Sequence, residues 1–134
     1  MRKITLLIII VLSFCTMAFR NAPGALRYSE MADKYVSEGQ TELALEYYSK
    51  AVALEPQNPT HYTTRGFFLL KLKRYDAALE DLSTVIKLEP QNPANFIARG
   101  LVYSDLKKQK EADADFATAC KMGSKDGCSF AGQQ

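Results

Sequence analysis

Apolar and polar positions along this chain recur at intervals of 34 residues. The hexapeptide Leu-Glu-Pro-Gln-Asn-Pro occupies residues 54–59 and, letter for letter, residues 88–93. A self-match at a fixed period of this length indicates a repeat architecture in which each unit is one pair of helices. Three such units tile the chain, at residues 25–58, 59–92 and 93–126.

Each unit places the same kinds of residue at the same positions. Large apolar or aromatic residues recur as Tyr28, Tyr62 and Phe96, as Tyr35, Leu69 and Tyr103, and as Tyr48, Leu82 and Phe116. Smaller residues recur as Ala32, Gly66 and Gly100, as Ala44, Ala78 and Ala112, and as Ala51, Val85 and Ala119. Small side chains allow two helices to approach closely, so the pattern predicts helices that pack on each other along the whole chain.

The expected helix boundaries follow from local signals. Asn58-Pro59 and Asn92-Pro93 each combine a good N-cap with a proline at the first helical position, so each begins the first helix of a unit. These first helices end at polar breaks, which are Glu38-Gly39, Lys73-Arg74 and Lys107-Lys108. The second helices are expected over residues 42–54, 75–88 and 109–122.

This pattern resembles the tetratricopeptide repeat (TPR) family over residues 25–126. The spacing, the small residues, the aromatic residues and the closing prolines Pro56 and Pro90 carry the resemblance, although the large aromatic position is Tyr or Phe here and never Trp. The resemblance implies an all-α fold of three helix pairs stacked in a right-handed superhelix. It also implies that a peptide or protein binds in the concave groove.

The resemblance places the groove on the first helix of each unit. The residues expected to bind a partner are Thr64, Phe67, Leu70, Lys71, Ile97, Leu101 and Ser104, with Ser29, Glu30, Asp33 and Val36 contributed by the first unit. Phe67, Leu70, Ile97 and Leu101 would form an apolar strip on which an amphipathic helix or an extended segment could lie. The alternative is that Phe67 packs on a neighbouring side chain without any ligand.

Some members of the family clamp a C-terminal carboxylate of their ligand with basic and amide side chains. The matching positions in this chain are Ser29, Asp33, Thr64, Ala94 and Ala98. None of them carries a positive charge, so the resemblance argues against ligands of that kind here.

The C-terminal segment carries two cysteines, Cys120 and Cys128. It resembles exported cysteine-rich repeats of the Sel1-like kind, and this resemblance implies a disulfide that clips one helix to the next. On a continuous helix the two residues would lie about 12 Å apart, so a disulfide needs the turn that Gly123 and Gly127 permit. Two free cysteines, or a bridge between two chains, are the alternatives.

No further helix is expected in the tail, residues 127–134. Repeat arrays normally need a polar terminal element to cover their last apolar face. We therefore expect Phe116 and Ala119 to lie at an exposed end, which either the tail or another molecule must cover.

The N-terminal segment, residues 1–22, has a composition of its own. Arg2 and Lys3 precede a 16-residue apolar run over residues 4–19. The run would measure about 24 Å as a helix, short of the roughly 30 Å hydrocarbon core of a bilayer. A basic start followed by such a run is typical of a secretory signal, here cleaved after Ala18. The alternatives are retention as a membrane anchor and lipidation of Cys15, which the bulky Phe14 before it disfavours.

Export would place the protein in a bacterial periplasm, or on the outer side of the inner membrane. The leader also accounts for the basic charge balance, because the chain without Arg2, Lys3 and Arg20 has 14 basic and 15 acidic residues. A near-neutral body with interspersed signs is not typical of nucleic-acid binding.

The sequence offers little catalytic chemistry. The single histidine, His61, has no cysteine or carboxylate cluster at ligand spacing, so we expect a surface or packing role and neither metal nor cofactor. Arg65 and Arg99 occupy equivalent positions, which indicates a structural role between units. The leading hypothesis is a non-enzymatic module that binds a protein partner. The alternative is a scaffold of the cell envelope that associates with copies of itself.

Overall fold

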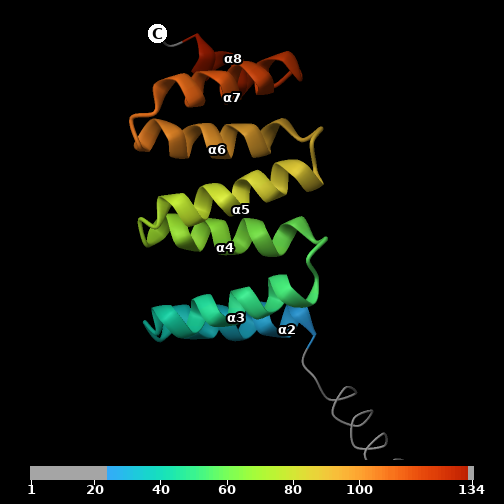
Figure 1. Cartoon of the computed structure of the whole chain (residues 1–134), viewed down its shortest axis with the longest axis vertical. Coiled ribbons are helices and arrows are strands. Elements are labelled where there is room, and N and C mark those ends of the chain that lie inside the picture. The colour runs from blue at the N-terminus through green and yellow to red at the C-terminus, as the bar shows by residue number, and fades with distance from the viewer. Residues whose placement is uncertain (1–23, 133–134) are drawn as a thin grey trace, which may run out of the picture.

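The computed structural model describes residues 24–132, and the expected leader with Cys15 lies outside this range. Seven helices and no strand occur in the described range. They are α2 (Ala25–Ser37), α3 (Thr41–Leu54), α4 (Pro59–Lys71), α5 (Tyr75–Leu88), α6 (Pro93–Asp105), α7 (Gln109–Lys121) and α8 (Lys125–Ala131). The helices stack in one column as the pairs α2–α3, α4–α5 and α6–α7, with α8 at the C-terminal end (Figure 1). The predicted all-α fold of three helix pairs is confirmed.

The first helices of the second and third units begin as predicted. The side-chain oxygen of Asn58 accepts a hydrogen bond of 3.1 Å from the backbone N–H of Thr60, and Asn92 does the same for Ala94. The turns that end the first helices need a left-handed residue. Gly39 supplies it in the first unit, whereas Lys73 and Lys107 adopt positive φ angles of 57° and 59° at the equivalent positions.

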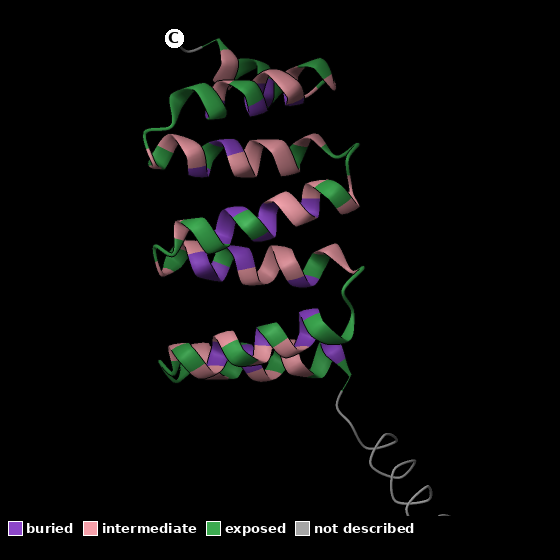
Figure 2. Ribbon diagram, in the orientation of Figure 1, coloured by how far each residue is buried: buried purple, intermediate pink, exposed green. Residues whose placement is uncertain are grey.

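The core runs continuously from one pair to the next. Tyr48 of α3 and Phe68 of α4 have ring centroids 5.4 Å apart and join the first and second units. Val102 of α6 packs with Leu79 and Leu82 of α5 and joins the second and third units. Figure 2 shows the buried residues distributed over all three helix pairs, so each unit is stabilised by its neighbour.

The N-terminal end of the stack has a polar surface. Lys34 and Glu38 occupy the positions held one repeat later by Phe68 and Leu72, which pack on the first unit. With no unit before them, Lys34 and Glu38 instead form an exposed ion pair of 3.7 Å. The first unit therefore closes this end of the array.

The C-terminal end of the third unit is covered by the chain itself, which is one of the two expected alternatives, although no helix was expected there. Helix α8 lies on α7, and the Phe130 ring stacks 5.1 Å from the Phe116 ring. Gly127 is buried against Ala119, and the Cys120–Cys128 disulfide joins the two helices with a Cα–Cα distance of 4.5 Å. A seven-residue helix containing a glycine has little stability of its own, so its sequence gives only a weak helical signal.

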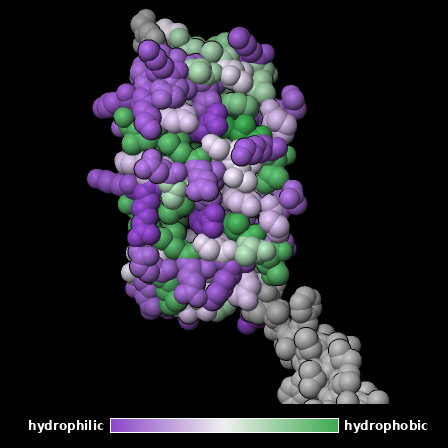
Figure 3. Space-filling view, in the orientation of Figure 1, coloured by the Kyte–Doolittle hydropathy of each residue, from purple (hydrophilic) through white to green (hydrophobic). Residues whose placement is uncertain are grey.

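None of the helices between residues 24 and 132 combines the length and the apolar character that a membrane crossing requires. On the face of the stack seen in Figure 3, hydrophilic side chains project from the edges of the column.

Candidate functional site

A cleft of about 450 Å³ opens between the first helices of the first and second units. It is lined by Asp33, Val36 and Ser37 of α2, by Tyr48 of α3, and by Thr64, Phe67, Phe68 and Lys71 of α4. Its surface is mainly apolar, with one acidic and one basic side chain. A concave apolar surface with a few polar groups is the usual form of a ligand site.

Two adjacent phenylalanines of α4 take different parts in this cleft. Successive residues of a helix point about 100° apart, so Phe68 turns toward α3 while Phe67 turns into the groove. Phe68 is 8% exposed and packs on Tyr48, whereas Phe67 is 49% exposed. Phe67 is thus a large apolar side chain that the described part of the chain leaves half uncovered.

The Tyr48 hydroxyl orients an acidic side chain at the cleft. The Tyr48 Oη donates a hydrogen bond to Oδ1 of Asp33, which lies on the facing helix α2. Burial of the phenol, together with this hydrogen bond, raises the pKa of Tyr48 well above its usual value. Tyr48 therefore stays protonated in the neutral range and holds the Asp33 carboxylate in place.

The predicted partner-binding residues of the second and third units fall into three groups. Thr64, Phe67 and Lys71 line the cleft. Leu70 packs on the core cluster of Leu79, Leu82 and Val102, so it stabilises the junction between the second and third units. The remaining three lie on α6 beyond the cleft, where Leu101 is 44% exposed and Ile97 and Ser104 are half-buried.

Tyr48 is the cleft residue that the sequence reasoning missed. Its repeat equivalents, Leu82 and Phe116, are plain core residues, so position alone indicates packing. Only the hydroxyl, which neither equivalent carries, could have suggested that one end of this side chain reaches a polar partner. Ser37 was missed as well, because it lies in the last turn of α2.

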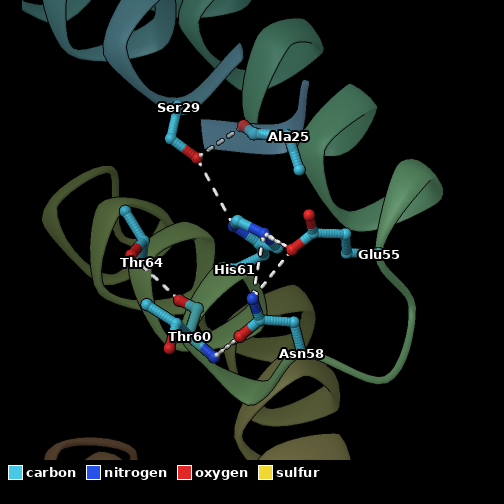
Figure 4. A network of polar contacts seen from close by, with 7 residues as sticks. All are labelled: Ala25, Ser29, Glu55, Asn58, Thr60, His61 and Thr64. Carbon is cyan, nitrogen blue, oxygen red and sulfur yellow. Dashed lines mark hydrogen bonds and ion pairs between the residues drawn. The ribbon is translucent and has the colours of Figure 1, made fainter. Parts of the chain in front are cut away.

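His61 fixes the way in which α4 meets the first unit (Figure 4). The ring is 7% exposed, with Nε2 2.9 Å from Oε2 of Glu55 and Nδ1 3.4 Å from Oγ of Ser29. Asn58 donates from Nδ2 to the same Glu55 oxygen over 2.9 Å. The hydrogen bond from Asn58, and next the one from His61, lower the pKa of Glu55.

This network explains the only histidine of the chain as a packing residue. It connects α2, the end of α3 and the start of α4, which are the elements that also form the cleft. No group of three or more His, Cys, Asp or Glu side chains between residues 24 and 132 is arranged to hold a metal ion.

Arg65 and Arg99 have the structural role that their repeat positions predict. Arg65 of α4 makes a bidentate contact with Asp81 of α5, at 2.9 and 2.7 Å, and donates to Ser49 of α3 over 3.1 Å. Arg99 repeats the arrangement with Asp115 and Ser83. Each arginine joins three helices and two units. The hydrogen bonds that Arg65 donates to Asp81, and Arg99 to Asp115, raise the pKa of each guanidinium.

Comparisons with known proteins agree with this architecture. A family model described as TPR repeat matches residues 32–73, and one described as Tetratricopeptide repeat matches residues 62–92. No curated protein is significantly similar to the chain. The Sel1-like resemblance of the cysteine pair stays a prediction, since both matched models describe tetratricopeptide repeats.

Several solved structures share the fold. The second TPR domain of human RPAP3, in complex with the HSP70 peptide SGPTIEEVD, is 27% identical, with a TM-score of 0.66 over 80% of this chain and 91% of that one. The first TPR of Spaghetti (RPAP3), bound to the HSP90 peptide SRMEEVD, is 24% identical, with a TM-score of 0.65 over 80% and 86%. MamA is 20% identical, with a TM-score of 0.67 over 75% and 58%.

The two family models together run from residue 32 to residue 92 and cover parts of the first two helix pairs. The third pair repeats the same contacts, including the arginine bridge and the asparagine cap. Residues 32–92 therefore match tetratricopeptide repeats, and the third helix pair has the same architecture.

Proposed function

We propose that this protein is a non-enzymatic interaction module that holds a segment of a partner protein in the cleft between α2 and α4. The observation that carries the proposal is the half-exposed Phe67 ring, which lines an open apolar cleft together with the buried Tyr48 and Phe68. Exposed apolar surface in a concave site marks a place where another molecule binds. An extended or helical segment of a partner suits this shape.

The similar structures support the proposal at the level of the fold. Two of them are TPR domains in complex with short peptides, so a helix-pair stack of this size can hold a peptide. We expect the partner of this chain to be a protein segment as well. The identity and charge of that segment have to be inferred from the side chains that line the cleft.

The scaffold hypothesis loses the feature that motivated it. Self-association was expected through an open third unit, but α8 covers that end with Phe130 and Gly127. Lys34 and Glu38 make the other end polar. Binding of a different protein is therefore the better supported of the two functions.

We further propose that the protein acts outside the cytoplasm, in a periplasm or attached to the outer side of an inner membrane. The apolar run at residues 4–19 supports export. The Cys120–Cys128 disulfide is consistent with it, because disulfides persist in oxidising compartments. Fractionation of cells that express the full chain, with the leader followed by mass spectrometry, tests this location.

Affinity capture with the full-length protein from its native cells tests the proposed function. Wild type, Phe67→Glu and Lys87→Glu are compared; Lys87 is an exposed residue of α5 that does not line the cleft. We expect Phe67→Glu to lose the captured partner while its helicity stays unchanged, and Lys87→Glu to retain both. Equal capture by all three proteins would place the binding surface elsewhere.

A further inference from the structure

One row of groove residues changes from acidic to apolar along the stack. Asp33 of α2, Phe67 of α4 and Leu101 of α6 occupy equivalent positions, one repeat apart, and all three are exposed. The neighbouring row begins with Glu30 and continues with Thr64 and Ala98. These two rows are therefore acidic on the first unit and uncharged on the second and third.

The Asp33 carboxylate can still accept a hydrogen bond from a ligand and pair with a cation. Its Oδ1 accepts the hydrogen bond from Tyr48, and no Lys or Arg between residues 24 and 132 forms an ion pair with it. Lys71 lies on the opposite wall of the cleft without pairing to Asp33. A carboxylate held in place beside an apolar floor favours a charge-assisted hydrogen bond from a cation.

An acidic ligand fits this arrangement poorly. The peptides held by the similar TPR domains, SRMEEVD and SGPTIEEVD, carry acidic residues at their C-terminal ends. In this groove such a ligand would bring like charges toward Asp33 and Glu30, and the positions expected to clamp a terminal carboxylate hold no basic residue. Like charges brought together at an interface suppress the wrong partner.

We propose that the cleft selects an internal partner segment in which one lysine or arginine is followed or preceded by apolar side chains. The cation lies against Asp33 on α2, and the apolar side chains cover Phe67 and Leu101. Lys71, one turn beyond Phe67, disfavours a second cation at the level of α4. This inference rests on the proposed function and adds the chemistry of the ligand to it.

Selection of short random segments displayed on phage, with full-length protein as bait, tests the inference. We expect wild type to enrich segments with a single basic residue near apolar ones, and Asp33→Lys to shift the enrichment toward acidic residues. For an enriched peptide, Asp33→Asn should weaken binding by about tenfold or more, since a charged hydrogen bond is lost. Asp33→Asn keeps an acceptor for Tyr48, so it serves if Asp33→Lys does not fold.

The outcomes separate the two levels of the proposal. Enrichment of acidic or free C-terminal sequences by wild type, or binding that Asp33→Asn leaves unchanged, would overturn the basic-ligand inference and leave the binding function intact. If wild type enriches segments no more strongly than the double variant Phe67→Glu, Leu101→Glu, the proposed function of the cleft is overturned, and the inference with it. Lys87→Gln, on α5 outside the cleft, is the matched charge control, expected to retain the preference for a basic residue.

Discussion

Whether a residue of this protein stabilises the core or lines the groove depends on the direction in which its side chain points. Phe67 and Phe68 are chemically identical neighbours, but one closes the core and the other lies open in the groove. Tyr48 does both, because its ring packs on Phe68 and its hydroxyl reaches Asp33. The Arg65 guanidinium likewise has two contacts, since it lies 5.9 Å from the centre of the Tyr62 ring and binds the buried Asp81 carboxylate.

The Arg65–Asp81 pair should contribute strongly to stability. The Asp81 side chain is only 4% exposed, so Arg65→Met would leave a buried carboxylate without its cation. We expect the free energy of unfolding in urea to fall by about 3 kcal/mol. The double variant Arg65→Met, Asp81→Asn should recover part of that loss, because the unpaired charge is gone. A single variant as stable as wild type would contradict this role.

The pH dependence of stability should include a contribution from Glu55. Its pKa lies below the usual value of 4.5 in the folded state, since Asn58 and His61 donate hydrogen bonds to the carboxylate. The stabilisation is therefore complete above the usual pKa and is lost as the pH falls through the lowered one. In urea titrations, wild type should exceed Glu55→Gln in stability near pH 7, and the difference should shrink near pH 3. A difference that is the same at both pH values would contradict this contribution.

At the scale of the helices, the sequence predicts most of the arrangement because each signal is local and repeated. Asn58-Pro59 and Asn92-Pro93 mark helix starts by their own chemistry, and α5 has the predicted bounds. Helix α8 was not predicted, because a disulfide and one ring contact hold it in place rather than helical propensity.

The cleft, like the helices, could be predicted from the sequence only in part. Thr64, Phe67 and Lys71, which the repeat frame assigns to the groove, line the cleft, because groove positions recur with the period. The repeat frame could not show that Leu70 packs on the core cluster of Leu79, Leu82 and Val102. That contact depends on how adjacent helix pairs are oriented relative to each other. Nor could the frame show the hydrogen bond between Tyr48 and Asp33, whose positions in the other units hold no such pair.

Close packing of α8 on α7 makes Gly127 sensitive to substitution. A Cβ at this position would lie 2.7 Å from Cβ of Ala119 and 2.8 Å from the backbone nitrogen of Cys120. We therefore expect Gly127→Ala to displace α8 and lower the thermal midpoint, despite the better helical propensity of alanine. Gly132→Ala, where the nearest atom is 3.3 Å away, is the matched control. An equal or higher midpoint for Gly127→Ala would mean that α8 packs less closely than described.

At the scale of the whole molecule, three units are close to the minimum for a stable stack, so both ends must be closed. The first unit is closed by polar side chains and the third by α8 with its disulfide. In a stack closed at both ends, the groove with the exposed Phe67 and Leu101 offers apolar surface to a partner.

The disulfide should stabilise the described stack measurably. Its short loop restricts the unfolded chain and contributes about 2–3 kcal/mol. Addition of a dithiol reductant should lower the urea midpoint of wild type, whereas a Cys120→Ser, Cys128→Ser variant should start at the lower midpoint and not respond. A wild-type midpoint that does not change under verified reduction would show that α8 is held by packing alone.

Photo-crosslinking in native cells shows directly whether the cleft holds a partner, with the reactive residue placed at Phe67 and, in a second protein, at Lys87. We expect an adduct with one different protein from position 67, formed through an internal segment of that protein, and no such adduct from position 87. Adducts only with copies of the same chain, or none from position 67 in correctly folded protein, would contradict the claim that this cleft holds a partner.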